Sequence, residues 1–279
     1  MGKLREQMIQ DLQLKGTTPH TQHIYLREVG NLARYFSKSP DELTEQEIKE
    51  YLLHLKGKNL ADGTIRFYVA GIKFLYGTTL QQEWAHKIKF GKRKKKLPVV
   101  LDLSEVHKLF AVTDNIKHRA ILMIMYSAGL RISEVMHLKI TDIDSKRMMV
   151  YVRQGKGGKD RYSILSQTAL DCLRQYWRQY HPKQWLFEGQ NKNAPMCYTA
   201  VRNIFCDAMK SAGITKPACP HTLRHSFATH LIESGVSLHH VQLLLGHTSP
   251  NTTTVYLHVS KVNLAQVVSP LDKTSNHTA

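Results

Sequence analysis

The chain is divided by a block of five consecutive cations, Lys92-Arg93-Lys94-Lys95-Lys96, which Leu97-Pro98 follows. Adjacent like charges cannot be buried together, so this block cannot lie in a hydrophobic core. A chain of 279 residues is long enough to form a core on each side of it. We therefore expect two domains, residues 1–91 and residues 99–279, joined by a basic linker over residues 92–98.

The linker is part of a general excess of positive charge. The formal net charge is +17, and 42% of the residues are hydrophobic, which is too many for a disordered basic tail. Both parts share the excess, with 18 basic against 10 acidic residues up to position 97 and 21 against 12 beyond it. A folded protein of this kind is expected to act on a polyanion, and two basic domains on a basic tether suggest a clamp around it. The linker itself is open to two compatible interpretations: a solvated tether and a segment that crosses a phosphate backbone.

Secreted, membrane-spanning and disulfide-stabilised proteins are excluded by the sequence. The longest apolar run, residues 120–130, is too short to span a bilayer, and the first residues contain no apolar signal segment. The four cysteines form no C-x-x-C pair and are expected to be reduced interior thiols; they are Cys172, Cys197, Cys206 and Cys219. We therefore expect a cytoplasmic protein without membrane contacts.

Helix signals dominate residues 1–91. Thr18-Pro19 is an N-cap followed by proline at the first helical position, and Thr44 with Glu47 forms a capping box. A third helix is expected from about Thr64, because apolar residues recur there every three or four positions. This part is predicted to be a small helical bundle, and because helix signals begin almost at residue 1, no additional N-terminal domain is expected.

The second part is predicted to be mostly helical with a small antiparallel sheet. Residues 147–153 and 161–165 have strand character, and a glycine-rich hairpin over residues 154–160 joins them. The helices are expected to start after Ser104, at Ser166, near Tyr198, at about Pro220 and at Ser237.

Several isolated cations are candidates for chemistry, although each alone is better explained as a surface residue or a helix cap. His221 and Arg224 lie on one helical face. His221 and His225 have the spacing of a zinc-binding helix, but Thr222 stands where that motif requires glutamate, so no metal site is expected. Arg131 follows a glycine in an apolar helical context, where a buried cation needs an anion.

Taken together, the order and spacing of six residues resemble the active-site signature of the tyrosine site-specific recombinases of the phage integrase family. Their gaps of 25, 65, 3, 23 and 9 positions fit that layout, and the resemblance covers almost the whole chain; the six are Arg131, Lys156, His221, Arg224, His247 and Tyr256. The resemblance implies a SAM-like core-binding domain in front of a catalytic domain. Together these form a clamp around double-stranded DNA.

The resemblance also implies how the scissile phosphate is held. Arg131 and Arg224 would bind its non-bridging oxygens, because guanidinium groups neutralise the charge of a pentacoordinate transition state. His221 and His247 would hydrogen-bond the phosphate, and His221 would also be placed to take the tyrosine proton.

Cleavage would then proceed through covalent chemistry. Tyr256 would attack the phosphate, its hydroxyl made more acidic by the neighbouring cations, and Lys156 would protonate the departing 5′-oxygen. The resulting 3′-phosphotyrosyl bond conserves the phosphodiester energy, so neither ATP nor a metal cofactor is required. Other basic residues are expected at the DNA backbone, namely Lys92, Arg93, Lys94, Lys95, Lys96, Lys159 and Arg161. The remaining histidines of these motifs are assigned a structural role; they are His225, His230 and His258.

The biological role stays open among several alternatives. We expect an integrase or transposase of a mobile element that acts on inverted-repeat DNA as a tetramer, because one tyrosine per protomer cuts one strand. The tail after Tyr256 is a candidate helix for docking on a neighbour and resembles that of integron integrases, but the segment from Trp185 to Tyr198 is too short for their extra helix. The alternatives are Xer-type resolution of chromosome or plasmid dimers, a type IB topoisomerase, and a non-catalytic DNA-binding regulator on the same fold.

Overall fold

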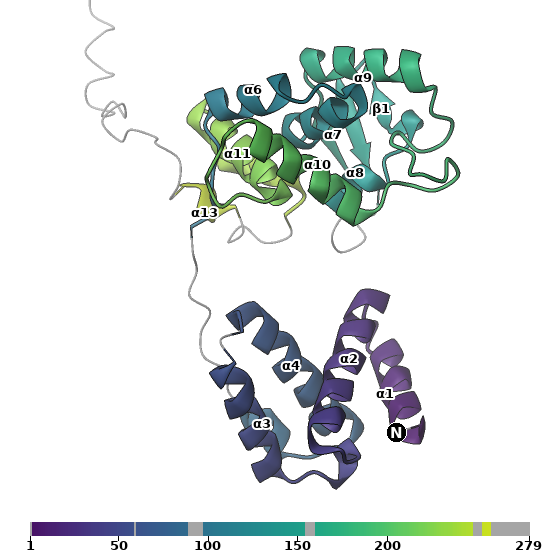
Figure 1. The fold of residues 1–279 in the computed structure, drawn as a ribbon, viewed down its shortest axis with the longest axis vertical. Coiled ribbons are helices and arrows are strands. Elements are labelled where there is room, and N and C mark those ends of the chain that lie inside the picture. Colours follow the sequence, from purple (N-terminus) through teal and green to yellow (C-terminus); the bar gives the residue numbers. More distant parts are fainter. Residues whose placement is uncertain (1, 59, 89–96, 154–159, 248–252, 258–279) are drawn as a thin grey trace, which may run out of the picture. The chain divides into compact units, whose positions relative to one another are not determined.

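The computed structural model describes residues 2–58, 60–88, 97–153, 160–247 and 253–257. The chain forms two compact units, Met1–Lys95 and Lys96–Ala279, each with its own core (Figure 1). Within the described ranges, no helix is both long and apolar enough to cross a membrane. The predicted fold class, mostly helical with a small antiparallel sheet, is confirmed.

The first unit is a helical bundle in which side-chain caps mark the starts of α2 and α3. Thr18 accepts a hydrogen bond from the Thr21 amide at the start of α2, and Thr44 and Glu47 form the predicted capping box of α3. Inward-facing residues such as Leu32 and Ile72 are fully buried. The elements are α1 (Gly2–Leu14), α2 (Pro19–Phe36), η1 (Pro40–Glu42), α3 (Glu45–Gly57), α4 (Asp62–Phe74), η2 (Leu75–Thr79) and α5 (Trp84–Lys87).

The second unit packs helices around a three-stranded antiparallel sheet of order β1-β2-β3. The register runs from the Met149–Ile164 pair to the Val152–Arg161 pair. The latter is the pair next to the glycine-rich segment, of which residues 154–159 lie outside the described ranges. The elements are α6 (Leu103–Ala111), α7 (Ile116–Ser127), α8 (Ile132–Met136), η3 (Ile140–Asp142), β1 (Ile143–Asp144), β2 (Met149–Val152), β3 (Arg161–Ile164), α9 (Gln167–Tyr180), α10 (Tyr198–Ser211), α11 (Pro220–Glu233), α12 (Leu238–Leu245) and α13 (Thr254–Leu257).

Helix α11 is the central element of this unit. Nine of its 14 residues are buried, and the hydroxyl of Ser226 receives a hydrogen bond from the Leu101 amide. Neighbouring helices cover α11, among them α7, α10, α12 and α13 (Figure 1). A helix covered on several sides gives rigid support to the side chains that it carries.

The prediction that the cysteines lie in the interior is wrong for three of the four. Cys172 is buried, whereas Cys197, Cys206 and Cys219 are exposed, and all four are free thiols. Cys197 and Cys219 occupy the N-cap positions of α10 and α11, where the chain enters the helix from the surface.

Candidate active site

Glu134 of α8 is the anion around which the arginines of the second unit gather. Its carboxylate is buried, and it accepts hydrogen bonds from Arg131 and Arg161. Burial raises the pKa of Glu134, but the hydrogen bonds and charge of Arg161, the Arg131 amide and the charge of Arg224 outweigh it and bring this pKa to about 2. The carboxylate is therefore ionised at neutral pH. It is the anion that the apolar sequence context of Arg131 led us to expect.

Arg131 is the N-cap residue of α8. Its amide donates to Glu134 Oε2 at 2.8 Å, and Nη1 of its guanidinium donates to Glu134 Oε1 at 2.7 Å. The side chain is still 20% exposed. Arg131 is thus held at one edge of its guanidinium while part of the group faces solvent.

Arg224 lies fully inside the unit. Its Nη1 donates to the Gly129 carbonyl at 2.7 Å and its Nη2 to the Leu245 carbonyl at 2.6 Å, while Glu134 lies 3.7 Å away. Nε is buried and has no hydrogen-bond partner among the described residues. Burial and the charge of Arg131 lower the pKa of Arg224 to about 9, so the guanidinium remains protonated at neutral pH.

Gly129 makes this arrangement possible. Its φ of +59° is in the left-handed region, and a Cβ atom there would lie 2.4 Å from the ring of Phe227. The turn between α7 and α8 can therefore approach α11 closely enough for its carbonyl to reach Arg224.

Arg161 lies in a different environment from the expected one. We predicted a DNA-backbone contact, but its side chain is only 8% exposed and donates twice to Glu134 and once, through Nε, to the Leu244 carbonyl. All three contacts turn the guanidinium inward. We therefore assign Arg161 a structural role at the junction of β3, α8 and α12.

Three histidine rings surround the same region. The rings of His221 and His225, one turn apart on α11, have centroids 4.5 Å apart. His247 follows the left-handed cap Gly246 of α12, and its Nδ1 lies 2.8 Å from the Thr253 hydroxyl. Desolvation is the larger cause and neighbouring positive charge the smaller, and together they lower the pKa of His221 and His225 to about 4 and that of His247 to about 3. All three imidazoles are neutral at physiological pH.

Tyr256 lies on α13 and is 2% exposed. Its ring stacks on His247 with 13° between the planes, and its hydroxyl lies 3.0 Å from Nδ1 of His225. The charges of Arg224 and Arg131 do lower the pKa of this hydroxyl, as expected, but burial has the larger effect and the net pKa is raised. Tyr256 is therefore a neutral phenol at physiological pH.

The structure thus gathers Arg131, His221, Arg224, His247 and Tyr256 around one buried carboxylate. Two members of this cluster were missed as functional candidates, Glu134 and His225. Helical spacing could have indicated both, because residues three or four positions apart are neighbours on a helix. Glu134 lies three positions after Arg131, and His225 lies four positions after His221. Several expected residues lie outside the described ranges, namely Lys92, Arg93, Lys94, Lys95, Lys96, Lys156, Lys159 and His258.

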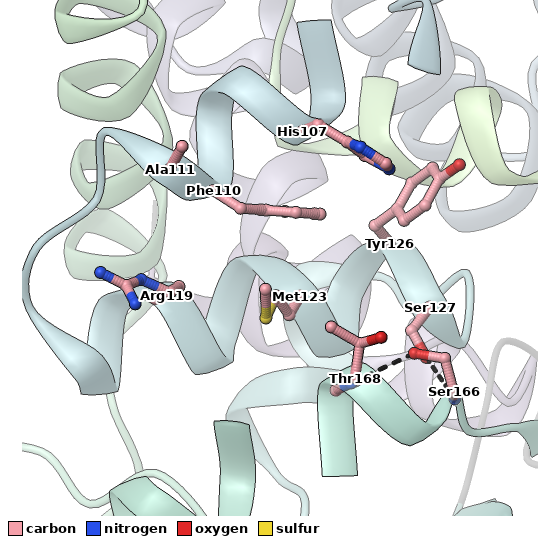
Figure 2. A pocket seen from close by; sticks show the side chains of 10 residues that line it. His107, Phe110, Ala111, Arg119, Met123, Tyr126, Ser127, Ser166 and Thr168 are labelled. Carbon is pink, nitrogen blue, oxygen red and sulfur yellow. Dashed lines mark hydrogen bonds between the residues drawn. The ribbon is translucent and has the colours of Figure 1, made fainter. Parts of the chain in front are cut away.

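A separate pocket of about 470 Å³ lies between α6, α7 and the start of α9. Figure 2 shows Phe110 and Tyr126 along its walls, with Arg119 at one end. The Tyr126 hydroxyl lies 2.8 Å from Nδ1 of His230, a second histidine–tyrosine pair outside the arginine cluster. Within the described residues, no three His, Cys, Asp or Glu side chains are grouped so that they could hold a metal ion.

Comparison with known proteins gives consistent matches to both units. Residues 99–262 match the model of the phage integrase family, and residues 4–86 match the phage integrase N-terminal SAM-like domain. A putative integrase/recombinase of Sinorhizobium fredii is 42% identical over 98% of this chain and 89% of its own length. The tyrosine recombinase XerD of Listeria innocua is 31% identical over 91% of this chain and 92% of its own. Among solved structures, the XerH recombinase bound to its difH substrate in a pre-cleavage complex has a TM-score of 0.71 and 25% identity, covering 88% of this chain and 77% of that one.

Proposed function

The chain belongs to the phage integrase family of tyrosine recombinases, and from this premise we propose that it is a DNA strand transferase whose nucleophile is Tyr256. The tyrosine oxygen attacks a phosphodiester and forms a 3′-phosphotyrosyl bond. A 5′-hydroxyl of the partner strand then reverses the step and rejoins the DNA. No energy source is consumed, because each step exchanges one phosphodiester for another.

The observation that carries the proposal is the unbalanced charge beside Tyr256. Three guanidinium groups, those of Arg131, Arg161 and Arg224, share the single carboxylate of Glu134. An excess of buried positive charge is costly unless an anion joins it. A phosphodiester supplies that anion, and its pentacoordinate transition state carries still more negative charge, so the cluster stabilises the transition state more than the ground state.

The individual roles follow from which donors are free. Arg224 offers Nε, which has no partner in the described part of the chain, and Arg131 has a partly exposed side chain, so both can bind non-bridging oxygens. His221 and His247 are neutral imidazoles and can donate one hydrogen bond each. Lys156 is assigned to protonate the 5′-oxygen from the glycine-rich segment between β2 and β3, on the strength of the family resemblance.

We further propose that the substrate is double-stranded DNA with an inverted-repeat site, bound by four protomers in the synaptic complex within the cytoplasm. The basic linker and Lys159 are assigned to the DNA backbone. The relative named integrase/recombinase supports integration or transposition of a mobile element as the biological role. Dimer resolution is the second candidate, because the Listeria relative is a XerD recombinase.

The test is covalent capture on a nicked duplex from which the 5′ fragment diffuses away after cleavage. The duplex carries a sequence taken from inverted repeats in the DNA that flanks the gene. Wild type should accumulate an SDS-resistant protein–DNA adduct in the presence of a chelator. Tyr256→Phe, which removes only the phenolic oxygen, should bind the same DNA and form none. An adduct in the phenylalanine variant would identify another nucleophile, and a requirement for Mg²⁺ would indicate another mechanism.

A further inference from the structure

The tyrosine proton has a closer acceptor than the one that the family signature suggests. The hydroxyl of Tyr256 lies 3.0 Å from Nδ1 of His225, which is hydrogen-bond distance. The ring of His221 contacts His225 instead, in a T-shaped arrangement. His225 thus lies between the first histidine of the motif and the tyrosine, and the rings of His225 and Tyr256 are 5.6 Å apart.

We propose that His225 is the general base of DNA cleavage, accepting the Tyr256 proton on Nδ1 as the tyrosine oxygen attacks. This rests on Tyr256 being the nucleophile. In the step, the tyrosine O–H bond breaks and its proton moves to Nδ1, while the oxygen forms a bond to phosphorus. The phosphorus–O5′ bond breaks, and O5′ receives a proton from the general acid assigned to Lys156. The role requires the His225 tautomer that carries its hydrogen on Nε2.

The charges that face His225 explain why the base acts only with DNA in place. Its titratable neighbours are His221, Arg224 and Tyr256, and Glu134 lies beyond Arg224. Burial and the charge of Arg224 keep the imidazole neutral, so it is ready to accept a proton. The imidazolium that proton transfer forms is destabilised by burial and by the charge of Arg224. The negative charge that develops on the scissile phosphate offsets this repulsion.

The consequence is a nucleophile that stays inactive until the substrate binds. Without an anion in the cluster, neither a tyrosinate nor an imidazolium is favoured, because burial opposes both charged forms. Binding of the phosphate makes the proton transfer favourable at the moment when the tyrosine can attack.

His225→Asn is the deciding variant, because the asparagine side chain places a polar atom close to the position of Nδ1 but cannot take up a proton. We expect it to slow single-turnover cleavage of the nicked duplex at pH 7 by about 10²- to 10⁴-fold, the usual contribution of a general base. The loss should shrink as the pH rises from 6 to 9, since hydroxide increasingly replaces the missing base. His230→Asn is the matched control, because His230 also lies on α11 and its Nδ1 also faces a tyrosine hydroxyl, that of Tyr126. This variant should cleave at the wild-type rate.

Each outcome decides the question. Near-wild-type cleavage by His225→Asn would overturn proton transfer, and so would a loss that is constant across the pH range, since a purely structural role predicts such a loss. DNA affinity and the unfolding midpoint are measured alongside to show that the variant is folded. If wild type forms no adduct, or if Tyr256→Phe still forms one, the proposed function fails instead, whatever the His225 variant does.

Discussion

Glu134 receives two parallel hydrogen bonds from Arg161, both 2.8 Å long, in the buried space between α8 and β3. The same carboxylate contacts Arg131 and lies 3.7 Å from Arg224. The paired geometry fixes the carboxylate plane, and the carboxylate in turn fixes the positions of the two arginines proposed to bind the phosphate. Glu134 is therefore a positioning residue for the site.

We expect Glu134→Gln to lower the free energy of unfolding by about 3–5 kcal/mol, because three guanidinium groups then lack their shared anion. Urea unfolding is the suitable measurement, since guanidinium salts would screen the charges. Asp171→Asn is the control: its ion pair with Arg174 is exposed on both sides, and its loss should cost less than about 1 kcal/mol. Equal effects of the two substitutions would contradict this account.

The pH dependence of stability gives a second measurement on Glu134. The pKa of Glu134 is about 2 in the folded chain, whereas the ordinary value is 4.5. As the pH falls, Glu134 is therefore protonated in the unfolded chain before it is protonated in the folded chain. The stabilisation is complete above about pH 4.5 and is lost as the pH falls toward 2. The difference in unfolding free energy between wild type and Glu134→Gln should therefore narrow over that interval. A constant difference would show that Glu134 does not titrate as described.

Arg131→Ala and Arg224→Ala should differ in what they damage. Each should slow cleavage by about 10²-fold or more, because each removes one charge from the transition state. Only Arg224→Ala should also reduce stability strongly, since Arg224 is fully buried and bonds two backbone carbonyls, whereas Arg131 is partly exposed. Single-turnover cleavage and urea unfolding on the same preparations separate the two effects. A stable Arg224→Ala would refute this structural role.

Gly129→Ala is expected to destabilise the second unit by about 2–4 kcal/mol, through backbone strain and a clash with Phe227. Gly213→Ala is the matched control, because its φ of +63° is similar but a Cβ atom there meets nothing within 4 Å. The control should cost about 1–2 kcal/mol, the backbone component alone. Thermal unfolding of both variants measures the difference, which would vanish if the approach to Phe227 were unimportant.

DNA binding should be strongly dependent on salt, because the net charge of +17 is shared by both parts of the chain. With on the order of ten phosphates neutralised, affinity should fall by several powers of ten between about 50 and 200 mM salt. Fluorescence anisotropy with a labelled duplex measures this slope. A truncated chain that starts at residue 99 should bind more weakly and show a shallower slope. Full affinity in the truncated chain would count against the clamp.

Much of the helical framework could be predicted from sequence because its signals are local. The starts of α2, α3, α9 and α12 coincide with side-chain caps at Thr18, Thr44, Ser166 and Ser237, and each cap acts within three residues. The two strands of the hairpin could likewise be predicted from local signals, namely the strand character of each segment and the glycine-rich connection between them. Ordered motif spacing indicated Arg131, His221, Arg224 and His247, which the fold brings together with Tyr256, but it did not indicate Glu134 or His225.

The features that could not be predicted from sequence depend on contacts between segments that are far apart in the chain. Arg161 has the sequence context of a DNA contact, and only the packing of β3 against α8 and α12 turns it toward Glu134. The pKa of Tyr256 was misjudged because the effect of neighbouring charges could be inferred from the motif, whereas burial could not. His225 was assigned a structural role because it matches no position of the family signature, and its contact with Tyr256, 31 positions away along the chain, becomes visible only in the fold.

The two carbonyl contacts of Arg224 have an evolutionary consequence. By bonding Gly129 after α7 and Leu245 at the end of α12, this side chain ties three helices together. A descendant that loses catalysis can therefore replace the partly exposed Arg131, or lose only the hydroxyl of the buried Tyr256, at less structural cost than the loss of Arg224. Retention of this arginine alone is weak evidence that a relative is active, and the tyrosine and the partly exposed arginine are the positions to inspect.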